Sequence, residues 1–174
     1  MTPTHLPGRV AIPALPEQTR TPPPGGLEPF NAAPPHGARA TLLTCLHSAR
    51  WAERVADHRP YPDIDALLAA CDEAAYDLTP AELSHALAAE ALPLLPEDVY
   101  SAAHTALSAA YAAYEAKFGH GFIICLDGLS HTESLDHVLA GIRSRLANDP
   151  EEERVVAAEE LRRLAKGRLV GHLA

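Results

Sequence analysis

The sequence predicts an all-α fold, and three observations support this prediction. Alanine contributes 33 and leucine 24 of the 174 residues, and both residue types favour helices. Aromatic residues, which favour strands, make up only 5% of the chain. Sequences typical of helix starts recur between residues 31 and 150. We therefore expect a single domain of six or seven helices.

The N-terminal region differs in composition from the rest of the chain. Ten of the 16 prolines precede residue 36, and the run from Pro22 to Gly26 cannot continue a helix or a strand ladder. We predict that residues 1–28 form a disordered, Pro/Gly-rich tail and that residues 29–174 form the helical domain. The tail is either inert or a proline-rich docking site for a partner, and the composition leaves both alternatives open.

The first half of the domain contains three predicted helices. Asn31 can cap a helix that reaches about Ser48, and Ser48 can cap the next one. This second helix must end before Pro60, because the residue preceding a proline is disfavoured in the helical region. Asp63 can then cap a third helix that extends through Ala75.

The middle of the chain contains the strongest helix start and the longest helical pattern. Thr79–Glu82 combines a capping threonine, a proline at the first helical position and a glutamate three residues after the cap. The helix that it starts is interrupted by the prolines within residues 92–96, and residues 97–118 form an alanine-rich helix that ends before Gly119. The apolar run 122–126 is either a short strand or a buried extended connector, because periodicity does not separate the two.

Two further helices complete the predicted domain. Ser130–Glu133 is a second capping box, and its helix continues through Leu146. Asp149–Glu152 begins the last helix, which has acidic residues in its first turn and basic residues near its end. This charge distribution matches the helix macrodipole.

Charge and cysteine usage exclude several classes of protein. The net charge is −9, so there is no domain-wide basic surface for nucleic acid. The sequence has no apolar run of about 18 residues and no signal-peptide core, so we expect no membrane contact. Three widely separated cysteines and scattered histidines predict a cytoplasmic protein with neither a disulfide framework nor a metal site.

Several short motifs carry a resemblance to a known family. Ser48–Trp51 precedes Arg59-Pro60-Tyr61, and Tyr114–Cys125 follows the alanine-rich helix. Arg145–Glu153 joins the last two predicted helices, and Lys166–Leu169 lies near the end of the chain. In this order and spacing, residues 30–172 resemble the family of OHCU decarboxylases, which act on 2-oxo-4-hydroxy-4-carboxy-5-ureidoimidazoline.

The resemblance implies an all-helical carbon–carbon lyase of the carboxy-lyase type, which works without a cofactor. Its substrate would be the small molecule OHCU, converted to (S)-allantoin and CO2 during urate degradation. Relatives are often dimeric, so the resemblance implies a homodimer, for which an exposed apolar face on the first helices would be the sign to look for. Such a site needs N–H donors and an arginine to stabilise developing negative charge, and ionisable groups for positioning and proton transfer.

The resemblance also implies candidate site residues. The family's His-Pro motif is absent, and the segment that follows it is shorter than in relatives, so Glu90 and His85 are the candidate catalytic residues. The two lie five residues apart, about 140° round an ideal helix, and so would not share a face. Arg168 matches the family's substrate-binding arginine, and Arg145 is the second choice. Phe122 and Ile123 match the stretch whose backbone N–H groups face the substrate.

The absent His-Pro motif leaves three functions open. The chain is a working decarboxylase with a rearranged site, a catalytically impaired relative that binds a small purine-derived ligand, or a non-catalytic helical module for protein association. Decarboxylation is the activity that we expect.

Overall fold

The computed structural model describes residues 26–95 and 97–174, and for residues 97–103 and 131 the backbone alone. The prediction of a disordered tail over residues 1–25 lies outside this range. The described residues form eight helices and no strand, which confirms the all-α prediction. The helices are α1 (Leu27–Ala32), α2 (Pro35–Cys45), α3 (Ala49–Asp57), α4 (Ile64–Tyr76), α5 (Pro80–Ala88), α6 (Glu97–Phe118), α7 (His131–Arg145) and α8 (Pro150–Leu173).

The start of the domain differs from the prediction. Pro34 and Pro35 divide the first predicted helix into α1 and α2, because Ala33 and Pro34 both adopt extended backbone angles. Asn31 lies within α1 and caps nothing. Its side chain instead accepts from the Tyr61 backbone N–H and donates to the Tyr61 carbonyl, both at 2.9 Å. Residues 27 and 28, the last two of the predicted tail, form the first turn of α1.

The other predicted helix starts are confirmed. The side chains of Ser48, Asp63, Thr79, Ser130 and Asp149 accept backbone N–H groups at the first turns of α3, α4, α5, α7 and α8, respectively. At the other end of α6, Gly119 has a φ of 79° and donates its N–H to the Glu115 carbonyl at 2.8 Å. This left-handed glycine ends α6 where the sequence predicted.

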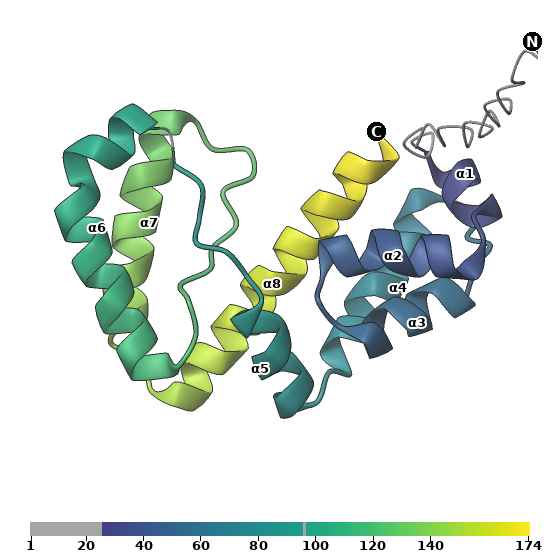
Figure 1. The fold of residues 1–174 in the computed structure, drawn as a ribbon, viewed down its shortest axis with the longest axis horizontal. Coiled ribbons are helices and arrows are strands. Elements are labelled where there is room, and N and C mark those ends of the chain that lie inside the picture. The colour runs from purple at the N-terminus through teal and green to yellow at the C-terminus, as the bar shows by residue number, and fades with distance from the viewer. Residues whose placement is uncertain (1–25, 96) are drawn as a thin grey trace, which may run out of the picture.

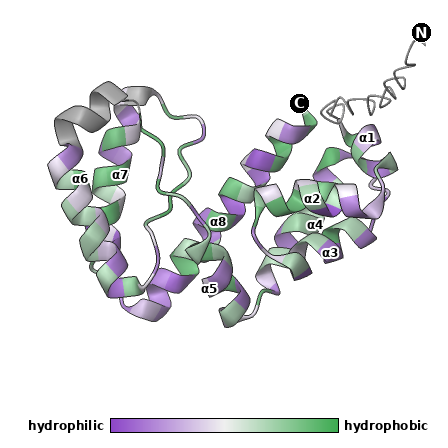
Figure 2. Ribbon diagram, in the orientation of Figure 1, coloured by the Kyte–Doolittle hydropathy of each residue, from purple (hydrophilic) through white to green (hydrophobic). Residues whose placement is uncertain are grey.

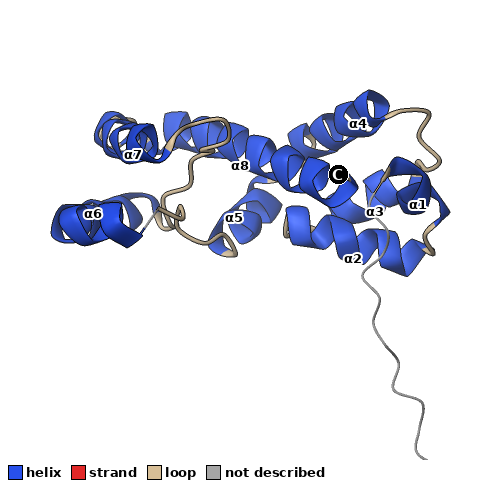
Figure 3. Cartoon of the chain, turned by 90° about the horizontal axis from the view of Figure 1, so that it is seen from above, coloured by secondary structure: helices blue, strands red, loops and turns tan. Residues whose placement is uncertain are grey.

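The long helix α8 connects two groups of helices (Figure 1). On one side, α2 packs on α3 and α3 on α4, and α2, α4 and α5 also contact α8. On the other side, α6 and α7 form an antiparallel pair. Seen from above, α8 lies between the α6–α7 pair and the α1–α4 group (Figure 3). The fold therefore has one apolar core around α8 and a second between α6 and α7.

The sequence of α8 explains how one helix serves both groups. Its buried residues recur every four positions, at Glu153, Ala157, Leu161, Ala165 and Leu169. Each step of four residues displaces the buried position by about 40°, so the face turns by about 160° over this length. Hydrophobic and hydrophilic residues accordingly alternate along α8 with no single apolar stripe (Figure 2). The first buried residue faces the α6–α7 side and the others join the core around α8.

Two non-helical segments run between α8 and the α6–α7 pair (Figure 1). Residues 89–95 connect α5 to α6, and residues 119–130 connect α6 to α7; we call the latter the α6–α7 connector. Its residues Phe122, Ile123 and Ile124 are buried but form no ladder. Of the two interpretations of this apolar run, the buried extended connector is confirmed.

A buried polar cluster fixes the α6–α7 connector in place. Arg145 donates to Glu153 Oε1 through Nε at 2.8 Å and Nη2 at 2.6 Å, and to the Ile123 carbonyl through Nη1 at 2.6 Å. The Tyr114 hydroxyl also donates to Glu153, and Asn148 donates to the other carboxylate oxygen at 2.9 Å. The cluster thus joins α6, α7, α8 and the connector.

Burial, followed by the hydrogen bond to Glu153, raises the pKa of Tyr114. The phenol therefore remains a protonated donor to Glu153 at neutral pH. A charged pair removed from water is stable only when its hydrogen-bonding groups are satisfied, and this cluster meets that condition.

No described helix has the length and apolarity needed to cross a membrane.

Replacing Thr79 with alanine should lower the free energy of unfolding by about 1 kcal/mol, because the N-terminal cap of α5 is lost. Urea denaturation followed by circular dichroism measures this change. Thr105→Ala is the matched control, since Thr105 is exposed within α6, where alanine is the better helix former. Equal effects of the two substitutions would contradict the capping role.

Replacing Arg145 with alanine should lower the free energy of unfolding by about 3–5 kcal/mol, because Glu153 is left charged and buried without its partner. The control is Arg154→Ala, which removes an exposed ion pair with Glu151 and should cost less than about 1 kcal/mol. If Arg145→Ala and Arg154→Ala gave similar denaturation midpoints, the cluster would not hold the fold together.

Candidate active site

Arg168 is the centre of the candidate site. It lies on α8 and makes a two-pronged ion pair with Glu90, with Nη1 at 2.9 Å from Oε1 and Nη2 at 2.6 Å from Oε2. Nη1 also donates to the carbonyl of Cys45, the last residue of α2, at 2.9 Å. One guanidinium thus joins α8, the end of α2 and the 89–95 segment.

The two members of this pair differ in exposure. The Glu90 side chain is 4% exposed, whereas the Arg168 side chain is 37% exposed. The hydrogen bond to Glu90 is the main cause that raises the pKa of Arg168, and the charges of Glu90, Cys45 and Asp127 add to it. Three of the five guanidinium N–H groups are engaged by Glu90 and Cys45, so the arginine is firmly positioned and still open on one side.

A cavity of about 310 Å³ adjoins Arg168. This volume is at the lower end of the range for small-molecule sites. The cavity wall comes from the 89–95 segment, the α6–α7 connector and α8, and its residues are Ala91, Leu92, Pro93, Leu94, Ile123, Ile124, Leu126, Asp127, Leu164 and Arg168. Two charged side chains of opposite sign therefore face an otherwise apolar space.

Sequence reasoning did not single out Asp127. It follows the apolar run of the connector and lies against Gly167, the residue before Arg168. A Cβ atom at position 167 would overlap the Asp127 carboxylate, so glycine is what permits this close approach. Two features of the sequence point to it: Asp127 directly follows the apolar run 122–126, and Gly167 directly precedes Arg168.

The structure brings together three of the six predicted site residues. Glu90 pairs with Arg168, and Ile123 lines the same cavity. Arg145 is instead buried in the cluster with Glu153, where it has a structural role. Phe122 is buried between α6 and α7, with its ring 4.6 Å from the Arg145 guanidinium.

His85 lies apart from the Arg168 cavity. It lines a separate groove between α5 and the start of α3, together with Arg50, Glu53 and Glu82. The geometry therefore does not join His85 and Glu90 in one site; α5 ends at Ala88, so Glu90 lies beyond the helix on which the sequence placed both residues.

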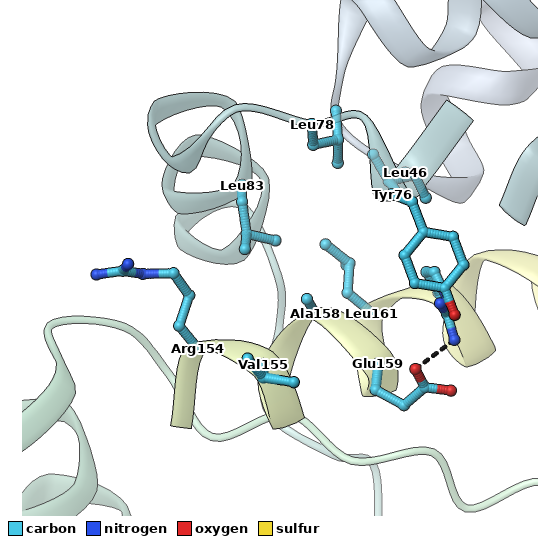
Figure 4. A pocket seen from close by; sticks show the side chains of 11 residues that line it. Leu46, Tyr76, Leu78, Leu83, Arg154, Val155, Ala158, Glu159 and Leu161 are labelled. Carbon is cyan, nitrogen blue, oxygen red and sulfur yellow. Dashed lines mark hydrogen bonds and ion pairs between the residues drawn. The ribbon is translucent and has the colours of Figure 1, made fainter. Parts of the chain in front are cut away.

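Two further cavities on the described part of the chain are lined mainly by apolar side chains. One of about 230 Å³ lies between α4, α5 and α8, and charged side chains such as Arg154 and Glu159 stand at its edge (Figure 4). Another, of about 560 Å³, lies between α1, α2 and the end of α8 and includes Phe30 and Pro34. The latter is apolar surface on the first helices and the end of α8.

Comparison with known proteins gives both family and fold. The family model described as OHCU decarboxylase matches residues 31–97 and 94–170. The two matches meet where the chain passes from the 89–95 segment into α6. A search among curated proteins gave no match.

Solved structures share the fold. A crystal structure of (S)-allantoin synthase has a TM-score of 0.69 and 21% identity, covering 87% of this chain and 54% of that one. The present chain thus spans about half the length of that protein. A crystal structure of OHCU decarboxylase in the presence of (S)-allantoin has a TM-score of 0.60 and 19% identity, covering 75% of this chain and 95% of that one. The family match extends over most of the helical domain, and the chain belongs to the OHCU decarboxylase family.

Proposed function

We propose that the chain converts OHCU to (S)-allantoin and CO2 in the cavity beside Arg168. The observation that carries this proposal is the position of Arg168. It lies in the second stretch matched by the family, is held by Glu90, and opens onto a cavity of small-molecule size. The substrate, activity and site residues that follow are parts of the same proposal.

The reaction requires stabilisation of negative charge. The bond between the ring carbon and the carboxylate breaks, CO2 leaves, and the electron pair moves from that carbon into the adjacent C=N bond of the ring. A proton is then added at the neighbouring ring carbon, which bears the ureido arm, while the hydroxyl group on the decarboxylated carbon loses its proton and becomes the ring carbonyl of allantoin. Arg168 binds the anionic end of the substrate and stabilises the charge that develops, an effect strengthened by the apolar wall of Ile123 and Leu164.

Glu90 and the cavity wall supply orientation. Glu90 holds the guanidinium plane through both carboxylate oxygens, which fixes the direction of its remaining N–H groups. The apolar wall covers one face of a bound ring, so that a proton from solvent arrives at the other face and one enantiomer forms. His85, Arg145 and Phe122 have no contact with substrate in this proposal.

A ligand-binding relative with little activity is the second candidate. The charge of Arg168 is already neutralised by Glu90, and the chain lacks the family's His-Pro motif. Both facts favour ligand binding over turnover. Stabilisation of the folded protein by (S)-allantoin, without acceleration of OHCU decay, would support this candidate.

The proposal also includes the cellular location and the assembly of the chain. Cys45, Cys71 and Cys125 are all free thiols in the structure, which supports a reducing compartment such as the cytoplasm. The homodimer stays a prediction.

The direct test follows the optical activity of the product. OHCU is generated in situ from urate, and circular dichroism monitors the allantoin that forms. We expect (S)-allantoin to accumulate faster than in the enzyme-free control. An unchanged rate and a racemic product would rule out decarboxylase activity.

Replacing Arg168 with alanine should lower kcat/KM by about 100-fold, because the cavity loses its donor to the developing charge. Arg163→Ala is the matched control, since Arg163 lies on α8 with 59% of its side chain exposed and pairs with Glu159 and Glu160. Glu90→Gln should lower kcat/KM by about tenfold, because one charge-assisted hydrogen bond to Arg168 is weakened. Thermal melts establish that each variant is folded. Equal activity of Arg168→Ala and Arg163→Ala would remove Arg168 from the site.

A further inference from the structure

The acidic side chain that lines the Arg168 cavity is Asp127, and its surroundings differ from those of Glu90. Glu90 is buried, and both of its carboxylate oxygens are bound by Arg168. Asp127 is exposed and lines the open cavity itself. Of these two carboxylates, Asp127 is therefore the one that can accept hydrogen bonds from a bound molecule.

The backbone holds Asp127 close to Arg168. Glu160 on α8 accepts the Cys125 N–H at 2.8 Å, which fixes the connector two residues before Asp127. Because Gly167 has no side chain, the Asp127 carboxylate packs directly against α8, one residue from Arg168. The cavity thus has the positive group of Arg168 on α8 and the negative group of Asp127, from the connector, beside the neighbouring position of that helix.

An ionised carboxylate accepts hydrogen bonds and donates none, whereas a guanidinium donates only. The proposed substrate has a matching pair of ends, because its carboxylate is an acceptor and its ureido arm and ring carry N–H donors. We propose that Asp127 is a substrate-binding residue that accepts N–H hydrogen bonds from the ureido arm, while Arg168 takes the carboxylate. This inference rests on the proposed function.

Binding measurements with two probes test the inference without turnover. Isothermal titration calorimetry measures the Kd of (S)-allantoin, which has a ureido arm, and of hydantoin, which has the ring alone. Asp127→Ala should weaken (S)-allantoin binding by about tenfold, the usual effect of losing a hydrogen bond to a charged group, and leave hydantoin binding unchanged. Gly167→Ala should weaken (S)-allantoin binding in the same direction, because the added methyl group displaces the Asp127 carboxylate.

Asp136→Asn is the control, because Asp136 is an exposed carboxylate on α7 that does not line the cavity. An unchanged (S)-allantoin Kd in Asp127→Ala, an equal loss of hydantoin binding, or no binding of (S)-allantoin to the unmodified chain would overturn the inference. The inference and the proposed function fail separately. Asp127-dependent binding without OHCU turnover contradicts the proposed function alone, and turnover with an unchanged KM in Asp127→Ala contradicts the ureide contact alone.

Discussion

The structure around the cavity depends on the buried ion pair between Arg145 and Glu153. This pair is almost removed from water, with side chains 7% and 1% exposed, so its charges must be compensated within the protein. The compensation comes from Tyr114, Asn148 and the Ile123 carbonyl, which brings three helices and a non-helical segment to one point. The α6–α7 connector contacts this cluster through the Ile123 carbonyl, and the same connector forms part of the wall of the Arg168 cavity.

Arg168 has the corresponding role at the opposite wall. Its contacts with Glu90 and Cys45 join segments that are 78 and 123 residues away in the sequence. Residues 90–95 are non-helical, and the ion pair of Glu90 with Arg168 holds this part of the chain beside α8. Arg145 and Arg168 therefore have different roles. Arg145 fixes the α6–α7 connector, which forms one wall of the cavity, and Arg168 faces the cavity itself.

Most of the helical frame follows from local chemistry and was predictable. Ser48, Asp63, Thr79, Ser130 and Asp149 cap helices because a short polar side chain before an amphipathic segment satisfies the first free N–H groups. The division at Pro34 was missed because Asn31 looked like a cap, although its amide is used by Tyr61, 30 residues away. The site was less predictable for the same reason. Nothing local distinguishes Arg145 from Arg168, or shows that Asp127 meets Gly167, because these relations are set by contacts between distant segments.

The central claim is that the ring of a ureide binds between Arg168 and Asp127, against Ile123. A crystal structure of the chain with (S)-allantoin tests it most directly. The account predicts density for the ring in the cavity of about 310 Å³ between α8, the 89–95 segment and the α6–α7 connector, with the ureido arm at Asp127. Density for the ligand in the groove beside Phe30, in the groove beside His85 or in the cavity beside Tyr76, with the Arg168 cavity empty, would contradict it.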